Sequence, residues 1–304
     1  QNEWEIIICT LNDGLYWEKF NLLGIKAYKL PLRILSLKTA YKLFLILRKE
    51  KPDLIHTHGK GPGFYGRSIS SFLNIPTVHT FHGFHYEDLK IFTRWIHLAV
   101  ENFLSLFTDQ HIFVSTGEKN RARVLKFLDE TNSIVIHNGV DHKYIDSLPI
   151  TRNKALELSE NKDWRNNKIL GTISRLSPEK GILILLAAFS KAIKKIPDLR
   201  LLIIGGYPEE HKGYYLEIQK LIAQENLSNC VRILGYRQDA VKILKCVDFY
   251  ISSSLSEGLP ISLLEALASR IPTIATEIVG NKDILCNSVF GVLTKPDSSE
   301  SLYK

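Results

Sequence analysis

Cysteine is scarce in this sequence and methionine is absent. Its 304 residues include 4 cysteines, with no CxxC pair, and no methionine. So few and scattered cysteines exclude a disulfide framework and a thiolate metal site, and they suit a reducing cytosol. The N-terminus has neither a basic start nor a small-residue cleavage site, so no signal peptide is expected. Because methionine is missing even at position 1, we expect an internal fragment of a longer protein.

Long apolar runs, blocks of one charge and several familiar catalytic motifs are also absent. The longest apolar stretch, 91–107, is interrupted by Arg94, His97 and Glu101, so no membrane span is expected. The net charge of +7 is spread without a dense basic block, which argues against nucleic acid as a partner but suits anionic small molecules or an anionic membrane face. There is no GxxxxGK[ST] loop, no GxSxG elbow, and none of the Asp-x-Asp motifs typical of metal-dependent sugar transferases.

An ordinary globular composition is present, with 45% hydrophobic and 23% charged residues. Short β-branched runs alternate with amphipathic helical patterns along the whole chain. The predicted strands are 5–9, 54–58, 77–80, 111–114 and 134–137, followed by 169–173, 200–204, 231–234, 249–252 and 273–275. The predicted helices include 36–48 and 116–128 in the first half, and 179–195, 213–224, 239–246 and 260–270 in the second.

This alternation predicts an α/β fold with parallel sheets. The patterning weakens between Asp141 and Asn167, where polar residues accumulate. We therefore expect two doubly wound, Rossmann-like domains facing a cleft, one at 1–145 and one at 146–304. In such sheets, ligands bind outside the carboxyl ends of the strands.

The most specific segment follows the strand predicted at 249–252. A loop with Gly258 and Leu259 leads to Pro260, which we expect to be the first helical residue. The free backbone N–H groups of such a helix N-terminus attract an anion.

Two carboxylates flank this helix start. Glu257 lies at the predicted strand tip, where functional carboxylates usually lie, and Glu265 follows eight residues on, inside the helix. The alternative is that Glu265 belongs with Ser262 and Ser269, at spacings of three and four, to an ordinary solvent-exposed stripe.

A second segment carries two cations. Ser177 is a natural N-cap, with Pro178 as the first helical residue, so Lys180 falls in the first helical turn. A cation there opposes the helix dipole at a cost of about 0.3–1 kcal/mol. With Arg175 at the preceding strand end, the pair suits a bound phosphate or diphosphate. The alternative is a Lys180 side chain that extends into water.

Histidines gather in the first half. Five of the ten lie within thirty residues: His56, His58, His79, His82 and His85. An HxH at a strand end is also a metal-ligand arrangement, although only Glu87 and Asp88 offer carboxylates nearby. Structural histidines at the rim of a cleft are the alternative.

A glycine pattern at 61–66 matches GxGxxG and follows a strand. A dinucleotide fingerprint would also need an acid at the end of the next strand, but that strand ends at Thr80. Asp88 has the right distance but lies in the histidine-rich loop. We therefore do not expect a dinucleotide site.

Taken together, these segments resemble the retaining glycosyltransferases of family 4, which have the GT-B fold. Glu257 and Glu265 stand in an EGLPxxxLEA pattern with the spacing E-x7-E. Further segments resemble family motifs in the same order: 52–58, 79–85, 108–115, 137–141 and 174–181. The resemblance covers nearly the whole chain, although the family's first strand with its glycine-rich loop, and its C-terminal helices, have no counterpart in it.

The resemblance implies a donor-phosphate site. Arg175 and Lys180 would hold the diphosphate of a nucleotide-sugar, and the backbone of Gly258, Leu259 and Pro260 would meet its sugar and phosphate.

The resemblance also implies roles around the sugar and the nucleoside. Glu257 would bind hydroxyls of the donor sugar, Glu265 would bind the ribose, and His82 would reach across the cleft to the reacting sugar and phosphate. The nucleobase would be lined by three residues: Gly235, Tyr236 and Arg237.

The function implied is that of a hexosyltransferase that retains anomeric configuration, without a metal or other cofactor. The donor would be a UDP-sugar, and the acceptor a lipid-linked or polysaccharide or lipopolysaccharide-type molecule. Basic and aromatic residues of the first domain suit peripheral membrane contact at the cytoplasmic face of the inner membrane: Lys42, Arg48, Lys49, Arg94 and Trp95. The alternatives are a GT-B-fold epimerase or phosphorylase, a metal-dependent hydrolase that uses the histidine cluster, and a non-catalytic sugar-nucleotide-binding protein.

Overall fold

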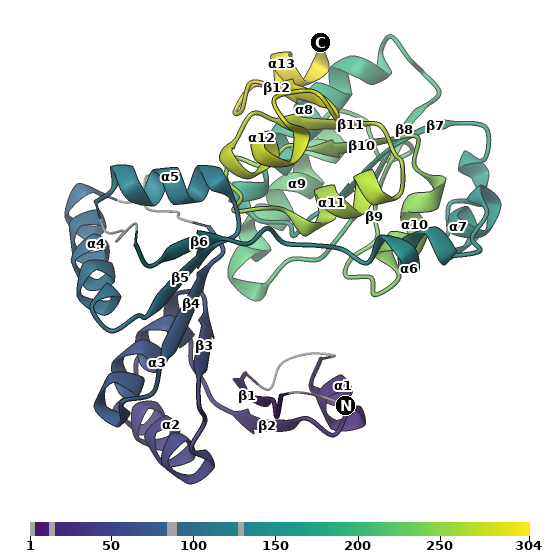
Figure 1. The fold of residues 1–304 in the computed structure, drawn as a ribbon. Helices are drawn as coiled ribbons and strands as arrows, with labels where there is room; N and C mark the ends of the chain where they lie inside the picture. The colour runs from purple at the N-terminus through teal and green to yellow at the C-terminus, as the bar shows by residue number, and fades with distance from the viewer. Residues whose placement is uncertain (1–3, 12–15, 84–89, 127–130) are drawn as a thin grey trace. The chain divides into compact units, whose positions relative to one another are not determined.

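The computed structural model describes residues 4–11, 16–83, 90–126 and 131–304. The chain divides into two compact units (Figure 1). Unit 1 comprises 1–114 and 119–136, and unit 2 comprises 115–118 and 137–304. The strands within every sheet pair in parallel.

Unit 1 contains two parallel sheets. One pairs β1 (Ile7–Thr10) with β2 (Lys26–Lys29), and the other has the order β3 (Ile55–His58), β4 (Thr77–Phe81), β5 (Gln110–Phe113) and β6 (Ser133–Val135). Five helices connect these strands: α1 (Tyr16–Leu22), α2 (Leu37–Glu50), α3 (Lys60–Leu73), α4 (Ile91–Ser105) and α5 (Thr116–Val124).

Helix α2 forms because its apolar residues recur at helical spacing and its start is capped. The Ser36 hydroxyl accepts a hydrogen bond from the Thr39 backbone N–H at 3.4 Å. Leu43 and Leu47, one turn apart, pack on Tyr65 of α3 in the main core of unit 1. This core anchors one face of α2 and leaves the opposite face outside it.

Unit 2 is built on a six-stranded parallel sheet in the order β12-β11-β10-β7-β8-β9. Its strands are β7 (Lys168–Ile173), β8 (Leu199–Ile204), β9 (Val231–Ile233), β10 (Phe249–Ser252), β11 (Thr273–Thr276) and β12 (Val292–Thr294). Its helices are α6 (His142–Ser147), α7 (Arg152–Leu158), α8 (Ile182–Ile193), α9 (Lys212–Gln224), α10 (Ala240–Ile243), α11 (Ile261–Ala268), α12 (Val279–Leu285) and α13 (Ser299–Tyr303). Four 3₁₀ turns complete it: η1 (Lys162–Trp164), η2 (Pro178–Lys180), η3 (Glu209–His211) and η4 (Leu244–Cys246).

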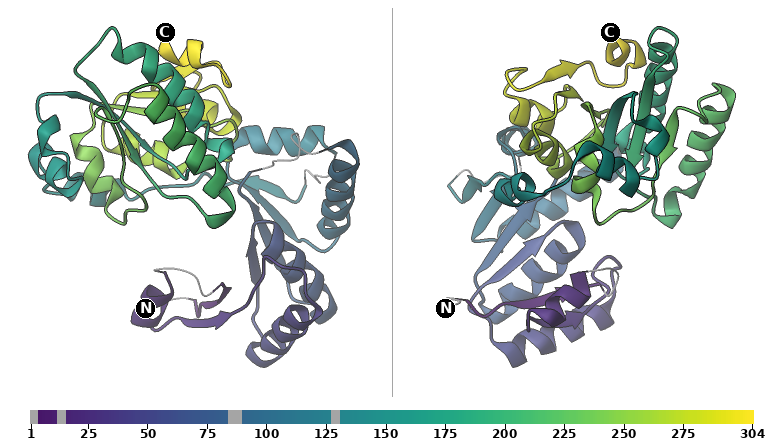
Figure 2. Two further views of the ribbon diagram at one scale, coloured as in Figure 1. Left: turned by 180° about the vertical axis from the view of Figure 1, so that it is seen from behind. Right: turned by 90° about the vertical axis from the view of Figure 1, so that its right-hand side faces the viewer.

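Helices cover both faces of this sheet (Figure 2). Successive residues of β8 point to opposite faces, as the pleat requires. Leu201 and Ile203 join a core with α8, α9 and α13, whereas Leu202 and Ile204 join a second core with α7, α10 and α11. Counted from β7, the strand order is 3-2-1-4-5-6, the doubly wound Rossmann order. The predicted Rossmann-like α/β fold is confirmed.

All ten predicted strands are present, with ends that differ by at most two residues. Strands β2 and β12, which are short and lie at sheet edges, were not predicted from the sequence. β2 reads Lys-Ala-Tyr-Lys with an exposed lysine at each end, and β12 has only 3 residues, so neither carries the apolar run that marks a buried strand. The GxGxxG pattern at 61–66 lies inside α3. Of the helix predicted at 116–128, the last two residues lie outside the described residues.

The prediction of a helix at 179–195 is wrong at its N-terminal end. Gly181 adopts a left-handed conformation with φ of 62°, so the 3₁₀ turn η2 ends there and α8 begins at Ile182. Lys180 therefore precedes the α-helix and lies outside its first turn, and Ser177 does not cap it. The helix predicted from Pro260 starts one residue later, with Pro260 in the capping position.

Gly181 also allows a close approach between chain segments. A Cβ at this position would lie 2.2 Å from the carbonyl oxygen of Ser253, which follows β10. We therefore expect Gly181→Ala to destabilise the fold by at least about 1–2 kcal/mol, the usual cost of a left-handed conformation for a residue with a side chain. Gly213→Ala is the matched control, because a Cβ there has open space. Thermal unfolding measures both variants, and an unchanged Tm for Gly181→Ala would contradict the described packing.

Candidate active site

The strand order of unit 2 reverses between β7 and β10, and ligands of doubly wound sheets bind outside the carboxyl ends of the strands at such a point. The loop after β7 carries Arg175 and Lys180, and the loop after β10 carries Glu257. The two segments selected from the sequence thus follow the two neighbouring strands between which the strand order reverses. They are brought together although 77 residues separate Lys180 from Glu257.

Three contacts join the two loops. The Lys180 Nζ donates to Glu257 Oε1 at 2.5 Å, the Ser253 hydroxyl donates to the Lys180 carbonyl at 2.8 Å, and the Leu255 N–H donates to the Glu179 carbonyl at 2.8 Å. Two of these contacts fix the backbone, so the ion pair forms between loops that are already held together.

The ion pair itself is largely shielded from water. The side chains of Lys180 and Glu257 are 14% and 15% exposed, and the Ser254 hydroxyl also donates to Glu257 Oε1 at 2.8 Å. Among the described residues, no partner is bonded to the other oxygen, Oε2. One carboxylate oxygen is therefore saturated by protein groups, and the second can accept from a ligand hydroxyl.

Arg175 provides a more open cation nearby. Its side chain is 68% exposed and lies 3.5 Å from Glu179 Oε1, which also accepts from the Ser177 hydroxyl at 2.5 Å. Burial raises the pKa of Glu179, but the bonds from Ser177 and its own backbone, with the charges of Arg175 and Lys180, lower it overall. A weak, exposed pair of this kind leaves the Arg175 guanidinium able to meet an anion.

The loop before α11 is held from two sides. The Asn138 side-chain amide donates to the Leu259 carbonyl at 2.9 Å, and a Cβ on Gly280 would lie 2.4 Å from the Gly258 carbonyl oxygen. Gly258, Leu259 and Pro260 are buried, so this segment can contribute backbone groups rather than side chains.

Glu265 lies on α11 and is partly buried, and this burial raises the pKa of its carboxyl. No hydrogen bond or ion pair engages that carboxylate within the described part of the chain. Ser262 and Ser269 are partly buried too, and Ser262 bonds to Tyr250. These three side chains are therefore less exposed than those of an ordinary solvent-exposed stripe.

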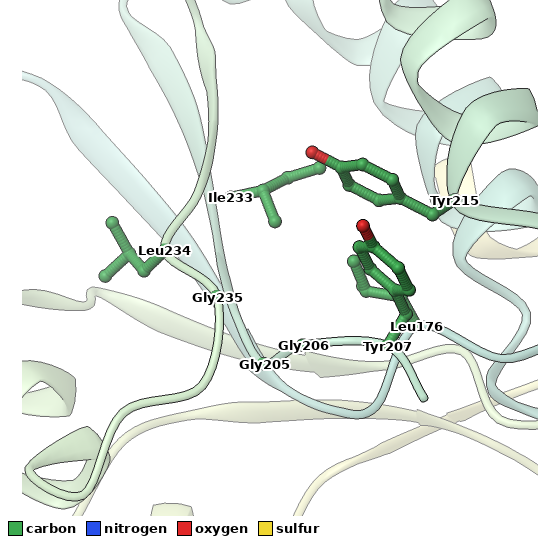
Figure 3. A pocket seen from close by; sticks show the side chains of 8 residues that line it. All are labelled: Leu176, Gly205, Gly206, Tyr207, Tyr215, Ile233, Leu234 and Gly235. Atoms are coloured by element: carbon green, nitrogen blue, oxygen red, sulfur yellow. The ribbon is translucent and has the colours of Figure 1, made fainter. Parts of the chain in front are cut away.

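A pocket of about 350 Å³ lies at the carboxyl ends of β8 and β9, beside the loop after β7 (Figure 3). Its lining residues are Leu176, Gly205, Gly206, Tyr207, Tyr215, Ile233, Leu234 and Gly235. The rings of Tyr207 and Tyr215 stack with centroids 4.3 Å apart and planes inclined by 19°. The pocket thus offers aromatic faces beside glycine backbone.

Of the three residues expected to line a nucleobase, only Gly235 lies on this pocket. Tyr236 is exposed, and Arg237 forms two 2.8 Å bonds to Asp239 and donates to the Leu158 carbonyl. The two stacked tyrosines were not predicted from the sequence. The signal for Tyr207 is the Gly-Gly-Tyr-Pro run directly after the strand predicted at 200–204.

Four of the clustered histidines lie on β3 and β4 or directly after β4, in unit 1. His58 Nδ1 is 2.9 Å from His82 Nε2, and the rings of His56 and His58 lie 4.2 Å apart. His79 is buried separately, with Nδ1 2.8 Å from the Thr57 hydroxyl. His85 falls outside the described residues.

These histidines are held neutral near pH 7. Burial, followed by the charges of His56 and His82, lowers the pKa of His58 to about 4. Burial also lowers the pKa of His56 and His82, and that of His79 falls well below its usual range through burial and the Arg67 charge. Within the described residues, no group of three or more His, Cys, Asp or Glu side chains could hold a metal ion.

Two family models match the chain. The model described as "Glycosyltransferase Family 4" matches residues 2–144, and "Glycosyl transferases group 1" matches residues 156–304. The UDP-Gal:alpha-D-GlcNAc-diphosphoundecaprenol alpha-1,3-galactosyltransferase of Escherichia coli is 30% identical over 281 residues, which cover 88% of this chain and 69% of that protein. The chain belongs to the family 4 glycosyltransferases. The expected enzyme class is confirmed, and neither the epimerase nor the hydrolase alternative gains support.

Solved structures resemble this glycosyltransferase over nearly its whole length. Anabaena HepE, in complex with UDP and glucose, superposes with a TM-score of 0.85 at 22% identity and covers 98% of this chain and 80% of its own. Sucrose-phosphate synthase from Thermosynechococcus elongatus reaches 0.81 at 20% identity, covering 99% and 78%. The glycosyltransferase therefore has the GT-B fold. No helix among its described residues is long and apolar enough to cross a bilayer.

The buried His79 makes the stability of the glycosyltransferase depend on pH. Its folded pKa lies below the ordinary value of 6.5, so the unfolded chain binds more protons once the pH falls below 6.5. We expect full stability above that pH and a Tm that falls progressively on acidification. The variant His79→Gln should flatten this dependence, whereas His142→Gln, at an exposed position, should not. Thermal unfolding between pH 7.5 and 5 tests this, and equal slopes in all three proteins would refute it.

Proposed function

We propose that this glycosyltransferase transfers a hexose from a UDP-sugar to a lipid-linked or polysaccharide-type acceptor, with retention and without a metal cofactor. The observation that carries the proposal is the Lys180–Glu257 pair at the strand reversal of unit 2, with Arg175 beside it. The Escherichia coli relative, named for a UDP-galactose donor and a diphosphoundecaprenol-linked acceptor, supports these substrate classes.

The donor diphosphate is assigned to Arg175, Lys180 and the backbone from Gly258 to Pro260. These two cations would neutralise the charge that develops on the departing diphosphate, which is the main electrostatic task of the reaction. Such protein cations can replace the divalent ion that other sugar transferases use. Lys180 is bonded to Glu257, so the ion pair orients the lysine side chain before the donor binds. A donor phosphate that binds Lys180 would then share this lysine with Glu257.

Glu257 is assigned to the transferred sugar, because its Oε2 is available to accept from a hydroxyl. Glu265 is assigned to the ribose, because its partly buried carboxylate has no protein donor in the described residues and a pair of hydroxyls would supply one. The nucleobase is assigned to the pocket with Tyr207 and Tyr215, which offers an aromatic face.

The retaining step is proposed to occur by same-face attack assisted by the leaving group, with no protein nucleophile. His82 of unit 1 is assigned to the reacting sugar and phosphate, as the family resemblance implies. Because the pKa of His82 is lowered by burial, its ring would act as a neutral hydrogen-bonding group near pH 7. In this proposal the enzyme acts at the cytoplasmic face of a membrane, where a lipid-linked acceptor would lie.

The absence of a metal requirement can be tested directly. If Arg175 and Lys180 hold the diphosphate, the affinity for UDP-glucose should be the same with and without EDTA. Isothermal titration in both conditions measures it, and Arg175→Ala should weaken binding in either buffer. A loss of affinity in EDTA that magnesium or manganese restores would refute the cation-pair assignment.

The two glutamates can be separated by their ligands. Glu265→Ala should weaken both UDP and UDP-glucose, since a charge-assisted hydrogen bond is worth about 1.5–3 kcal/mol, or roughly 10–150-fold in Kd. Glu257→Ala should weaken UDP-glucose far more than UDP, because only UDP-glucose carries the hexose that Glu257 is assigned to bind.

Titration of both variants with both ligands provides the measurement, and Glu217→Ala, an exposed residue of α9, is the control. If Glu265→Ala binds UDP as wild type does, the ribose assignment fails. If Glu257→Ala loses UDP affinity to the same extent as Glu265→Ala, the assignment of Glu257 to the sugar fails.

A further inference from the structure

Two buried polar residues support the loop that carries Glu257 from the side of β11, whereas Lys180 lies on the side of β7. This Glu257 loop comprises residues 253–260, between β10 and α11. Thr276 ends β11, which pairs with β10, and Asn281 lies on α12. The two residues are 1% and 0% exposed. Buried polar groups are hydrogen-bonded with few exceptions, so the partners of these two side chains indicate what they hold in place.

A chain of hydrogen bonds leads from Asn281 to Glu257. The Asn281 side-chain amide donates to the Thr276 carbonyl at 2.9 Å and to the Thr276 hydroxyl at 3.3 Å. Because this hydroxyl accepts from Asn281, its single proton is directed at the Ser254 carbonyl, to which it donates. The Ser254 hydroxyl in turn donates to Glu257 Oε1 at 2.8 Å. Each bond therefore restrains the donor of the next one, and the last acceptor is the carboxylate.

The peptide unit between Ser254 and Leu255 is held from both neighbouring strands. Its carbonyl accepts from Thr276 at the end of β11, and its N–H donates at 2.8 Å to the Glu179 carbonyl in the loop after β7. A trans peptide unit is planar, with its C=O and N–H pointing in opposite directions, so these two bonds fix its plane. The plane of this peptide unit restrains the backbone from which the Ser254 side chain projects.

The Ser254 hydroxyl can give Glu257 an orientation that Lys180 alone cannot. A lysine ammonium is a point charge on a flexible stem, so its ion pair fixes the distance to a carboxylate better than the direction of that carboxylate. Serine has a short side chain, and here its backbone is held on both sides. With both donors on Oε1, the direction of Oε2 depends on the place of Ser254.

Asn281 is retained at a cost to stability. Its Oδ1 is buried, and no hydrogen-bond partner for this atom is present among the described residues. A buried acceptor without a partner destabilises the folded state. The two bonds that the amide donates to Thr276 therefore explain an asparagine at this position better than stability does.

We propose that Thr276 and Asn281 are positioning residues for the donor sugar: they hold Ser254, and Ser254 directs Glu257 Oε2 toward a sugar hydroxyl. Both act through Glu257 and neither contacts the donor. A ligand is bound well only where the accepting group is held within about 0.5 Å of its productive place. The proposal rests on the proposed function for the assignment of Glu257 to the transferred sugar.

Isothermal titration of the 304-residue chain with UDP and with UDP-glucose tests the proposal. Thr276→Val removes the hydroxyl and keeps the branched shape of the side chain. Its affinity for UDP-glucose should fall roughly fivefold, the value of one ordinary hydrogen bond, and its affinity for UDP should stay within about twofold. Thr276→Ser keeps the hydroxyl and should restore the affinity for UDP-glucose.

The same substitution at the other end of β11 is the matched control. Thr273 is 3% exposed, and its hydroxyl donates to the Ile271 carbonyl at 3.0 Å. Thr273→Val should therefore bind both ligands as wild type does. Ser254→Ala removes the last bond of the chain and should reproduce the effect of Thr276→Val. It decides the test if thermal unfolding shows that Thr276→Val is not folded.

A double-mutant cycle separates positioning from a general loss of structure. In a Glu257→Ala background, Thr276→Val should cause no further loss of affinity for UDP-glucose, because its effect reaches the sugar only through that carboxylate. A residue that merely stabilised the loop would weaken UDP binding as well, and its effect would add to that of Glu257→Ala.

The proposal is overturned if Thr276→Val and Ser254→Ala bind UDP-glucose as wild type does, or if they weaken UDP to the same extent. It is also overturned if Thr276→Ser does not restore binding, or if the loss persists in the Glu257→Ala background. In these cases the proposed function remains valid as long as Glu257→Ala itself weakens UDP-glucose. If Glu257→Ala binds UDP-glucose as wild type does, the assignment of Glu257 to the sugar fails and the positioning role fails with it.

Discussion

The ion pair between Lys180 and Glu257 is the interaction on which the candidate site depends. It joins the loops after β7 and β10, where the strand order of unit 2 reverses. Both side chains are largely shielded from water, so the pair bears a desolvation cost that is offset only while both partners are present. The backbone contacts around Ser253, and the close approach that Gly181 permits, hold the two charges together before any ligand arrives. A diphosphate would then enter a site whose cation is already oriented.

The fold was predictable where its elements are buried on both faces. Strands such as β8, with Leu201 to Ile204 all buried, read as apolar runs, because helices cover both sides of the sheet. The short edge strands β2 and β12 lack that signal. The break at Gly181 was also invisible in the local pattern, because Glu179 to Lys195 is otherwise a good helix. The left-handed conformation of Gly181 allows a close approach to Ser253, more than seventy residues away in sequence. A local helical pattern carries no information about such a distant contact.

Several residues of the candidate site could be selected from the sequence, but the contacts between them could not be predicted. Glu257, Lys180 and Arg175 were singled out because a carboxylate at a strand tip and cations near a helix start are unusual. That Lys180 bonds Glu257 depends on the strand order, which local reasoning does not give. Asp239 lies only two residues after Arg237, so their ion pair could have been predicted from the sequence. The Gly-Gly-Tyr-Pro run after β8 likewise contains Tyr207.

The distribution of charge separates the tasks of the two units. The histidines that end β3 and β4 are held neutral by burial and by one another, so they add no positive charge for a diphosphate. In the proposed site, that charge comes from Arg175 and Lys180 in unit 2. Neutral imidazoles suit the polar, uncharged surface of a sugar. In the proposed site, unit 2 thus supplies the cations for an anionic donor and unit 1 supplies uncharged polar groups.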